Sequence, residues 1–331
     1  MKALVYTGIG QLELRDLPAP EAEFIVRVLG SGICGTDVKT YTKGHHLFTP
    51  PTVLGHEFYG RVEHSFPGSG FSAGDPVVVA PYAECGKCAL CAAGAGTLCR
   101  HKSFVEGGAF CEYVGIPSSY VATGVFAIPE ADDAFTLVEP LACVLNGVEH
   151  LKIRPTSKVL VVGAGPMGAL FALLFEARGI PVTVVEPSAL RRDAVASWGI
   201  DAREPGAVQA GDYDNIVIAV NRKELVEEYI KSIADTGTVL MFAGLGKGEA
   251  VAIDSYSIHY REVALSGCSG YAMPHFRKAL ELIIEHRDIF SRVISRRMPL
   301  GEGKEAFALL QSGQAFKIVL KPGSENEGSL R

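Results

Sequence analysis

The sequence contains no long apolar run and no strong excess of one charge. No stretch approaches the roughly 18 consecutive apolar residues that a membrane-spanning helix needs, so we expect no membrane partner. The formal net charge is −6, with acidic and basic residues mixed along the chain, so no continuous basic surface is expected to bind nucleic acid. The first 16 residues contain no basic segment followed by an apolar one, which predicts a cytoplasmic protein.

The length of 331 residues exceeds the about 250 to 300 residues that a single hydrophobic core supports. It therefore predicts two domains. Residues 1–140 are rich in glycine, proline and short β-type runs, which predicts an irregular β region without long helices. From Ser157 onward, apolar strands alternate with amphipathic helices, as in an open parallel sheet covered on both faces. The tail, GSENEGSLR at 323–331, shows no such pattern and is expected to fray.

Gly163, Gly165 and Gly168 form a G-x-G-x-x-G pattern, with Pro166 and Met167 inside it. In a nucleotide-binding turn the first glycine permits the tight turn, the second lets a pyrophosphate approach, and the third lets helix pack on strand. Taken alone, the pattern fits a simple turn equally well. The apolar strand before it and the helix after it favour a dinucleotide site, because N–H groups at a helix start face the phosphates.

Glu186 lies 18 positions after Gly168, at the end of the second apolar strand. A carboxylate at this place accepts hydrogen bonds from the adenosine ribose and repels a 2′-phosphate, so NAD is favoured over NADP. Arg191 is a further candidate for contact with the cofactor. Because Arg191 and Arg192 could hold a phosphate, the choice of NADP stays open.

Four of the eight cysteines form a C-x2-C-x2-C-x7-C arrangement, namely Cys85, Cys88, Cys91 and Cys99. Such short spacings let four thiolates surround one tetrahedral zinc ion. Four thiolates leave no position for a substrate, so we predict a structural zinc that fixes a lobe with little core of its own. An iron–sulfur cluster also takes four cysteines, and disulfides are disfavoured in the cytoplasm. Zinc is preferred over both.

Further residues of metal-ligand type are scattered along the chain: Cys34 in GICGTD, His56 and Glu57 in LGHEFYG, and Glu139 in VEPLAC. Each alone also fits a buried thiol, a core histidine or a surface carboxylate. Together with the cysteine lobe, the motif GGAFCEY at 107–113 and the glycine turn, they make the chain resemble the zinc-containing medium-chain dehydrogenase/reductase superfamily. The resemblance covers nearly the whole chain, and the sorbitol, polyol and threonine dehydrogenases look most similar.

This resemblance implies two domains. A chaperonin-10-like β-barrel catalytic domain with both zinc sites would comprise residues 1–142 and 274–331. A Rossmann domain, a doubly wound parallel sheet that binds NAD, would comprise residues 143–273. The implied activity is transfer of a hydride between a secondary alcohol of the substrate and NAD, in a homodimer or homotetramer built through the Rossmann domain.

The resemblance also implies a second, catalytic zinc, giving two zinc ions per chain. Its ligands would be Cys34 and His56, with Glu57 and Glu139 as oxygen ligands, directly or through water. The polyol branch has a glutamate where the alcohol dehydrogenases have a third zinc-binding cysteine, and Glu139 occupies that position here. Cys143, four residues later, is the rival ligand, although it also fits a small hydrophobic residue in a helix.

Three neighbouring residues would support catalysis at this zinc, which lowers the pKa of a substrate hydroxyl so that its carbon can release hydride. The resemblance assigns the proton relay to the hydroxyl of Thr36. Thr36 also fits a turn residue without a catalytic role. Asp37 would orient His56 through its other ring nitrogen. Lys39 stands where many relatives have a histidine that passes the proton outward, so lysine or water would take that step.

Substrate contacts are expected between the two zinc motifs. Four residues there line the pocket mouth or form a solvated loop, namely Tyr41, His45, His46 and Phe48. Because the ligand pattern with two glutamates resembles that of the polyol branch, a polyol, cyclitol or aminocyclitol is expected as substrate ahead of threonine or a simple alcohol. The competing classes are a non-catalytic relative and a zinc-free quinone or enoyl reductase, and the retained ligands argue against both.

Overall fold

The computed structural model describes residues 1–323, and the segment 324–331 of the predicted frayed tail lies outside the described residues. The chain forms two compact units. Unit 1 comprises Met1–Glu139, Ala272–Arg287 and the chain from Ile294 onward, and unit 2 comprises Pro140–Tyr271 and Asp288–Val293. Within residues 1–323, no helix combines the length and the apolar character needed to cross a membrane.

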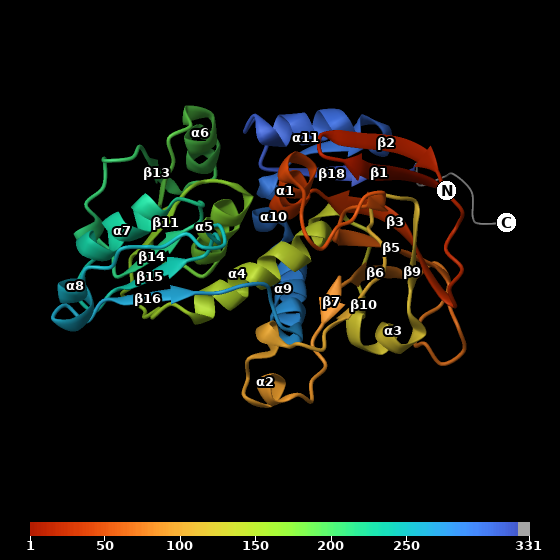
Figure 1. Cartoon of the computed structure of the whole chain (residues 1–331), viewed down its shortest axis with the longest axis horizontal. Coiled ribbons are helices and arrows are strands. Elements are labelled where there is room, and N and C mark those ends of the chain that lie inside the picture. The colour runs from red at the N-terminus through yellow and green to blue at the C-terminus, as the bar shows by residue number, and fades with distance from the viewer. Residues whose placement is uncertain (324–331) are drawn as a thin grey trace. The chain divides into compact units, whose positions relative to one another are not determined.

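Unit 1 is built from short strands in mostly antiparallel pairing (Figure 1). Its largest sheet has the strand order β10-β6-β5-β3-β18-β17, with β9 also paired to β3, beside the small sheets β2-β1-β4 and β7-β8. These strands are β1 (Lys2–Gly8), β2 (Gln11–Asp16), β3 (Phe24–Gly32), β4 (Thr52–Val53), β5 (Glu57–His64), β6 (Pro76–Val79), β7 (Tyr82–Ala83), β8 (Ser103–Phe104), β9 (Tyr113–Ile116), β10 (Val125–Ala127), β17 (Ile294–Pro299) and β18 (Lys317–Lys321).

Most helices of unit 1 are short, and α9 (Met273–Glu285) is the longest of them. They are α1 (Gly35–Lys43), α2 (Ala89–Ala92), α3 (Ser118–Gly124), α9 (Met273–Glu285) and α11 (Gly303–Gln311), with the 3-10 turns η1 (Gly96–Leu98), η2 (Asp133–Leu137) and η5 (Leu300–Glu302). The chain changes unit within α4 (Val138–Glu149), just before α9, within α10 (Arg287–Phe290) and just before β17. The core of unit 1 includes Leu4, Tyr6, Phe110 and Phe307.

Helix α1 corrects the sequence-based interpretation of the segment between the two zinc motifs. Its start is fixed because the Asp37 carboxylate accepts a hydrogen bond from the Cys34 N–H at 2.9 Å, while the Cys34 sulfur accepts one from the Thr36 N–H. Such a capping arrangement satisfies N–H groups that have no partner within the helix. Tyr41 therefore lies on a helix and not in a loop, and its ring packs against Phe307 with centroids 5.2 Å apart.

Unit 2 is a six-stranded parallel sheet in the order β13-β12-β11-β14-β15-β16. Its strands are β11 (Val159–Val162), β12 (Val182–Val185), β13 (Asp201–Arg203), β14 (Asn215–Ile218), β15 (Thr238–Met241) and β16 (Ala264–Gly267). This is the doubly wound order, in which the chain returns to the middle of the sheet and continues in the opposite direction. The Rossmann fold that the sequence predicted is therefore present.

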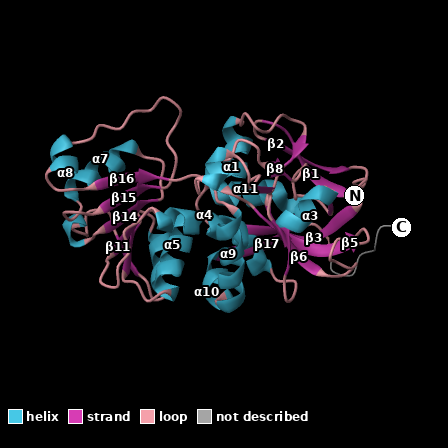
Figure 2. Ribbon diagram, turned by 90° about the horizontal axis from the view of Figure 1, so that it is seen from below, coloured by secondary structure: helices cyan, strands magenta, loops and turns pink. Residues whose placement is uncertain are grey.

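Helices cover both faces of this sheet. They are α5 (Pro166–Ala177), α6 (Ala189–Ser197), α7 (Lys223–Ser232) and α8 (Ser255–His259), with the turns η3 (Ala210–Asp212) and η4 (Ser291–Val293). Right-handed crossovers place α5 and α7 on opposite faces, because the chain crosses the sheet in opposite directions on the two sides of β11. Figure 2 shows α5 and α7 on opposite sides of the strands. Residues of α5 such as Phe171 are fully buried, which contributes about 1.5 to 3 kcal/mol each.

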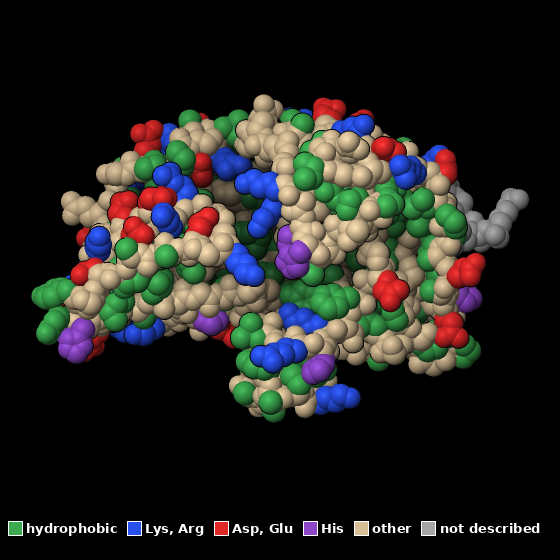
Figure 3. Space-filling model, in the orientation of Figure 1, with side chains coloured by type: hydrophobic (Ala, Val, Ile, Leu, Met, Phe, Trp, Pro, Cys, Tyr) green, Lys and Arg blue, Asp and Glu red, His purple; other side chains and the backbone are tan. Residues whose placement is uncertain are grey.

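The division of the chain differs slightly from the predicted domain limits. The units change at 139/140 and 271/272, beside the predicted changes at 142/143 and 273/274, but residues 288–293 belong to unit 2. Within that unit, Arg292 donates a hydrogen bond to the backbone oxygen of Trp198 at 3.3 Å. On the face shown in Figure 3, acidic and basic side chains are intermixed.

Candidate metal and nucleotide sites

The four cysteines of the lobe place their sulfur atoms together. The Sγ–Sγ distances are 3.5 Å for Cys88–Cys91, 3.5 Å for Cys85–Cys99, 3.8 Å for Cys88–Cys99 and 4.0 Å for Cys85–Cys91. A tetrahedron of thiolates at the usual Zn–S bond length has edges of about 3.8 Å. The distances therefore fit one zinc ion, and they are far too long for disulfide bonds, which need about 2.05 Å.

Backbone N–H groups support negative charge on these sulfurs. Cys99 Sγ accepts hydrogen bonds from the N–H of His101 at 3.3 Å and of Cys85 at 3.4 Å. The backbone N–H of Cys91 is the main cause that lowers the pKa of the Cys88 thiol to about 6. Burial, by contrast, raises the pKa of the Cys91 thiol to about 12. Because metals bind thiolates and not thiols, a metal that loads the lobe must displace this proton.

The lobe is anchored to unit 1 at the start of helix α9. Both carboxylate oxygens of Glu84 accept a hydrogen bond from the Met273 N–H, at 3.1 and 3.0 Å. A side chain at Gly96 would lie 3.3 Å from Glu84 and from Ala272. The lobe therefore packs closely against the N-terminus of α9, and glycine is the residue that permits this approach.

A second group of ligand-type residues lies where β3, α1 and β5 meet. The ligand atoms of Cys34, His56 and Glu57 all lie within 4.8 Å of one another. Glu57 begins β5 and is paired with Gly32 of β3. A Cβ at Gly32 would lie 2.4 Å from the Glu57 carboxylate, so only glycine leaves room for that side chain.

The imidazole of His56 is held by Asp37. Asp37 Oδ1 lies 3.5 Å from His56 Nδ1 and accepts a hydrogen bond from the Gly55 N–H at 3.3 Å. Burial favours the neutral ring, but the charges of Asp37 and Cys34 outweigh it and raise the pKa of His56 well above its usual range. Because zinc takes a neutral imidazole and a thiolate, loading this site releases protons.

Lys317 is a residue of this region that the sequence analysis missed. Its Nζ donates to both oxygens of Glu57, at 2.7 and 2.6 Å, and the two side chains are 1% and 0% exposed. Burial disfavours the ammonium, but the Glu57 carboxylate outweighs this and raises the pKa of Lys317. No local signal marks Lys317, because it lies on the last strand, 260 positions from Glu57.

Glu139 is the second residue of α4 and is 9% exposed. It is not a member of the group within 4.8 Å, although its charge interacts with those of His56 and Glu57. Burial, opposed by His56 and reinforced by Glu57, raises the pKa of Glu139 to about 7. Cys143, its proposed rival, lies farther along α4 and is partly exposed. A positive ion beside Glu139 would favour the carboxylate.

The remaining residues of the segment divide between core and surface. Thr36 and Lys39 are exposed on α1. His45 and His46 follow the helix, with their rings stacked and the centroids 4.5 Å apart. Phe48 is partly buried against the core of unit 1, as Tyr41 is, so these two aromatic side chains serve packing.

The glycine turn of unit 2 joins β11 to α5. Gly163 has φ +99°, a conformation that favours glycine, and a Cβ at Gly168 would lie 1.9 Å from the Gly163 carbonyl oxygen. Gly165 is the N-cap of α5, and a Cβ there would meet nothing within 4 Å. Pro166 follows at the first helical position and Met167 is partly exposed. The open side at Gly165 suits close approach of a pyrophosphate.

Glu186 follows strand β12 directly and faces this turn. Its carboxylate accepts hydrogen bonds from the N–H groups of Ala164 at 2.8 Å and Ser188 at 2.9 Å. Arg192 donates hydrogen bonds to the backbone oxygens of Glu186 and Pro187 at 2.9 and 2.7 Å. These bonds hold its side chain against the loop that follows β12. Arg191, also a sequence candidate, has its buried Nε without a hydrogen-bond partner in the described chain.

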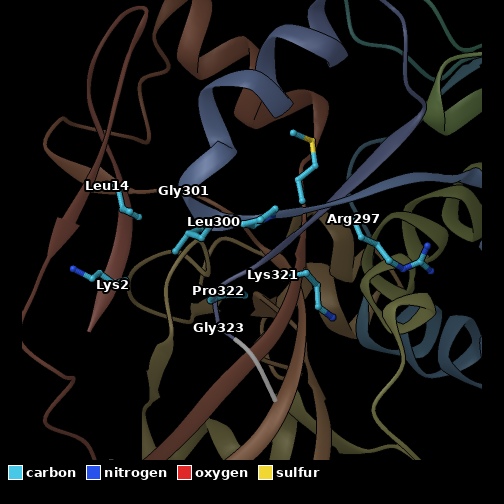
Figure 4. A pocket seen from close by; sticks show the side chains of 10 residues that line it. Lys2, Leu14, Arg297, Leu300, Gly301, Lys321, Pro322 and Gly323 are labelled. Atoms are coloured by element: carbon cyan, nitrogen blue, oxygen red, sulfur yellow. The ribbon is translucent and has the colours of Figure 1, made fainter. Parts of the chain in front are cut away.

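A cavity of about 390 Å³ opens elsewhere in unit 1 (Figure 4). Figure 4 shows Arg297 and Lys321 on one side of it and Lys2 and Leu14 on the other. None of the sequence-predicted site residues lines it. Arg297 and Lys321 form ion pairs with the buried Asp133 carboxylate at 2.6 and 2.7 Å. These ion pairs attach strands β17 and β18 to the turn η2, so the two charges are already paired.

Comparisons with known proteins agree with this arrangement. Residues 20–129 match the family model "Alcohol dehydrogenase GroES-like domain". The chain is 30% identical to D-altritol 5-dehydrogenase of Agrobacterium fabrum, over 91% of this chain and 94% of that protein. It is 28% identical to sorbitol dehydrogenase of Halalkalibacterium halodurans, over 97% and 99%. A putative zinc-binding dehydrogenase from Sinorhizobium meliloti, bound to NADP, superimposes with a TM-score of 0.85 at 28% identity, over 97% and 99%.

A GroES-like unit joined to a doubly wound parallel sheet defines an oxidoreductase of the alcohol dehydrogenase class. The chain belongs to the zinc-containing medium-chain dehydrogenase/reductase superfamily, in the branch of the sorbitol and threonine dehydrogenases.

Proposed function

We propose that this dehydrogenase uses zinc to transfer a hydride between a secondary alcohol of a polyol, cyclitol or aminocyclitol and NAD. The observation that carries the proposal is the group of Cys34, His56 and Glu57, whose ligand atoms lie within 4.8 Å of one another. One thiolate, one imidazole and carboxylates fit a zinc site that keeps an open position for substrate. A zinc ion bound there supplies Lewis acidity that lowers the pKa of the substrate hydroxyl.

The residues around this group have distinct tasks. Cys34 and His56 hold the metal, Glu57 and Glu139 supply the oxygen ligands, and Asp37 fixes the orientation of His56 through the 3.5 Å contact with Nδ1. Lys317 neutralises Glu57, whose two oxygens it binds. These ligands distinguish the chain from zinc-free reductases and from a non-catalytic relative.

The proton of the substrate hydroxyl needs a path to solvent. The Thr36 side chain lies at the exposed start of α1, beside Cys34. We assign the first step of the relay to its hydroxyl and the outer step to Lys39 or to water. Lys39 lies three residues farther along the same helix, on the same face.

We assign the nucleotide to unit 2 and both metals to unit 1. The turn Gly163–Gly168, which contains Pro166 and Met167, would receive the pyrophosphate at the N-terminus of α5. Glu186 would accept hydrogen bonds from the ribose hydroxyl groups and repel a 2′-phosphate, which favours NAD over NADP. Arg191 would contact the adenosine part, because its side chain lies close to Glu186 in sequence and has a buried donor without a partner. Hydride transfer needs both sites.

The second zinc ion, in the four-cysteine lobe, has a structural role. A closed thiolate site has no free position for a substrate. We therefore propose two zinc ions per chain, one for each of the two groups of ligand-type residues.

The substrate class follows from the set of oxygen ligands and from the relatives. Two carboxylates near one thiolate and one imidazole resemble the polyol branch, and the named relatives include dehydrogenases of D-altritol and sorbitol. A related protein is named L-threonine 3-dehydrogenase, so threonine and simple alcohols are the alternative substrates.

We further propose a homo-oligomer in the cytoplasm. None of the eight cysteines, all within residues 1–323, forms a disulfide bond, which fits a reducing compartment. Strand β16 forms an edge of the sheet in unit 2, and exposed apolar side chains precede it, namely Ile253, Tyr256, Ile258 and Tyr260.

The decisive experiment measures reduction of NAD and NADP by the purified protein with polyols, cyclitols, aminocyclitols, threonine and simple alcohols, before and after dialysis against a chelator. We expect turnover of a polyol-type alcohol with NAD, loss of turnover on chelation, and recovery with zinc. Cys34→Ser should abolish turnover and lower the zinc content by one ion per chain. Cys111→Ala is the control, because Cys111 is buried and belongs to neither ligand group. Absence of turnover with every alcohol at full zinc occupancy would contradict the proposal.

A further inference from the structure

The exposed face of helix α1 that carries Thr36 is lined by positive charge alone. Thr36, Lys39 and Lys43 are spaced three and four positions apart, so they share one face of the helix. All three are exposed. After the helix ends, His45 and His46 continue this surface with stacked rings. These four cationic or ionisable side chains, Lys39, Lys43, His45 and His46, are called the α1 basic cluster below.

No carboxylate of residues 1–323 forms an ion pair with the α1 basic cluster. Residues 35–51 contain one acidic residue, Asp37, which is fully buried and accepts hydrogen bonds from the N–H groups of Cys34 and Gly55. Among the ion pairs of residues 1–323, none includes a member of the cluster. A cluster without internal counter-charge attracts an anion from solution.

The members of the cluster lie within electrostatic range of one another. Burial, followed by the charges of His46 and Lys39, lowers the pKa of His45. His45 Nδ1 accepts a hydrogen bond from the Leu47 N–H at 3.3 Å, so the neutral ring carries its proton on Nε2. His45 therefore offers a hydrogen-bond donor even when uncharged.

The cluster begins beside the candidate catalytic metal. Helix α1 starts directly after Cys34, and a rise of 1.5 Å per residue places Lys39 about 7.5 Å along the axis and Lys43 about 13 Å. The segment then returns to His56, so both of its ends are fixed at metal ligands. A substrate hydroxyl at the metal would thus leave the far end of a sugar-sized chain within reach of the flexible lysine stems.

We propose that the substrate is a polyhydroxylated compound with one anionic group, a carboxylate or a phosphate, which the α1 basic cluster binds. The proposal rests on the proposed function and narrows it, because a neutral sugar alcohol would leave the cluster without a partner. The charge of the cluster then determines which polyols are turned over, while the metal ligands determine the reaction. Charge-assisted hydrogen bonds from lysine and histidine supply the selectivity.

The test compares matched substrates in three arms, namely sugar acids, sugar-alcohol phosphates and the corresponding neutral sugar alcohols. We expect kcat/KM to be at least about tenfold higher for one anionic arm, and this advantage to shrink as ionic strength rises. His46→Gln and Lys43→Gln should each raise KM for the anionic substrate by about threefold to tenfold, with kcat nearly unchanged. Lys39 is kept, since it also stands in the proposed proton path.

Lys278→Gln is the matched control for loss of a surface charge, because Lys278 is exposed on α9 and pairs with Glu281. It should leave the ratio of anionic to neutral kcat/KM unchanged. Calorimetric binding of a sugar acid and of a sugar-alcohol phosphate to the zinc-loaded protein provides a readout that does not depend on turnover. His46→Gln should weaken that binding.

The possible outcomes separate the two proposals. Equal turnover of neutral and anionic polyols, with ratios unchanged in His46→Gln and Lys43→Gln, would overturn the anionic substrate and leave the dehydrogenase assignment intact. Salt-sensitive binding of an anionic polyol without any hydride transfer would retain the α1 basic cluster as a ligand site and overturn the proposed reaction. Preference for the carboxylate or the phosphate arm identifies which anion is bound.

Discussion

At the scale of single residues, Lys317 shows how one charge stabilises the region of the candidate catalytic metal. Its ammonium is 2.6 Å from the Glu57 carboxylate, and both side chains are buried. Lys317→Met leaves that carboxylate charged in a site that excludes water. We expect the variant to lower the free energy of unfolding by about 3 to 5 kcal/mol, as measured by urea denaturation of the metal-free protein.

Two further variants separate loss of this pair from loss of any lysine. Lys278→Met removes an exposed lysine whose pair with Glu281 contributes at most about 1 kcal/mol, so it should cost little. The double variant Glu57→Gln with Lys317→Met should regain much of the lost stability, because no buried charge remains. A double variant as unstable as Lys317→Met alone would show that the uncompensated carboxylate is not the cause.

Glu186 is the residue at which we expect a substitution to change the choice between NAD and NADP. Its carboxylate already holds the N–H groups of Ala164 and Ser188, so its position is fixed before a ribose arrives. Glu186→Gln removes the charge that repels a 2′-phosphate, and it weakens the hydrogen bonds that the side chain accepts from the ribose hydroxyl groups. We expect kcat/KM for NAD to fall about tenfold or more and the ratio of NADP to NAD to rise.

The control for this change is Glu204→Gln, since Glu204 follows strand β13, is exposed and pairs with Arg192 on α6. Glu204→Gln should change neither kcat/KM for NAD nor kcat/KM for NADP. If Glu186→Gln leaves the ratio of NADP to NAD unchanged, the assignment of the ribose to Glu186 is wrong.

At the scale of elements, Asp133 ties η2 to three strands of the large sheet. Its carboxylate accepts hydrogen bonds from Tyr59 on β5, Arg297 on β17 and Lys321 on β18, at 2.8, 2.6 and 2.7 Å. Burial alone would raise the pKa of Asp133, but the contacts with Lys321, Tyr59 and Arg297 outweigh it and lower that pKa. The folded state therefore favours the ionised form.

This pKa shift has a defined sign for stability. Because the folded pKa lies below the unfolded value of about 3.9, the contribution is complete above that pH and is lost as pH falls through the folded pKa. Asp133→Asn should cost about 1.5 to 3 kcal/mol at pH 7, with a smaller difference from the parent protein at pH 3. An equal difference at both pH values, measured by denaturation, would exclude the charge as the cause.

The four-cysteine lobe is an element that we expect a zinc ion to hold together. Its helix α2 has four residues, none of them buried, so little apolar surface stabilises it. Cys91→Ser should remove one zinc ion per chain and make the lobe sensitive to limited proteolysis, while NAD binding to unit 2 stays unchanged. Cys268→Ser is the control, because Cys268 lies outside both ligand groups. A protease-resistant lobe in the zinc-depleted variant would contradict the structural role of that zinc.

The elements differ in how far the sequence predicts them. The strands and helices of unit 2 were predictable, because apolar runs such as those of β11 and β14 are fully buried in a parallel sheet. Strand β17 was not, since Ser295, Arg296 and Arg297 are exposed on it and interrupt any alternating pattern. Helix α1 was missed because its N-cap is a cysteine, an atypical capping residue.

At the scale of the whole molecule, the chain order links the last strand to the first metal motif. Strand β18 pairs with β3, and Lys317 on β18 donates to the backbone oxygen of Ile33, 284 positions earlier. Contacts this distant cannot be read from local patterns. The motifs and the resemblance therefore predicted that Cys34, His56 and Glu57 lie together, but they gave no sign of Lys317, which pairs with Glu57. Unit 1 therefore completes its sheet only after unit 2 has been added to the chain.

Association of copies is the last property of the whole molecule that the structure allows to be tested. Tyr256 and Tyr260 are 60% and 71% exposed just before the edge strand β16, and their rings lie 5.1 Å apart. Exposed paired tyrosines beside a free sheet edge are typical of an interface, where one tyrosine contributes about 2 kcal/mol or more and an edge strand can pair with a second copy. Tyr260→Lys should therefore raise the dissociation constant of the oligomer about thirtyfold, seen by sedimentation as a smaller species at micromolar concentration.

Leu190→Lys, at a residue 55% exposed on α6, should leave the mass unchanged. If Tyr260→Lys sediments as the parent protein does, the interface does not use this edge, because a lysine ammonium buried there without a partner would oppose association.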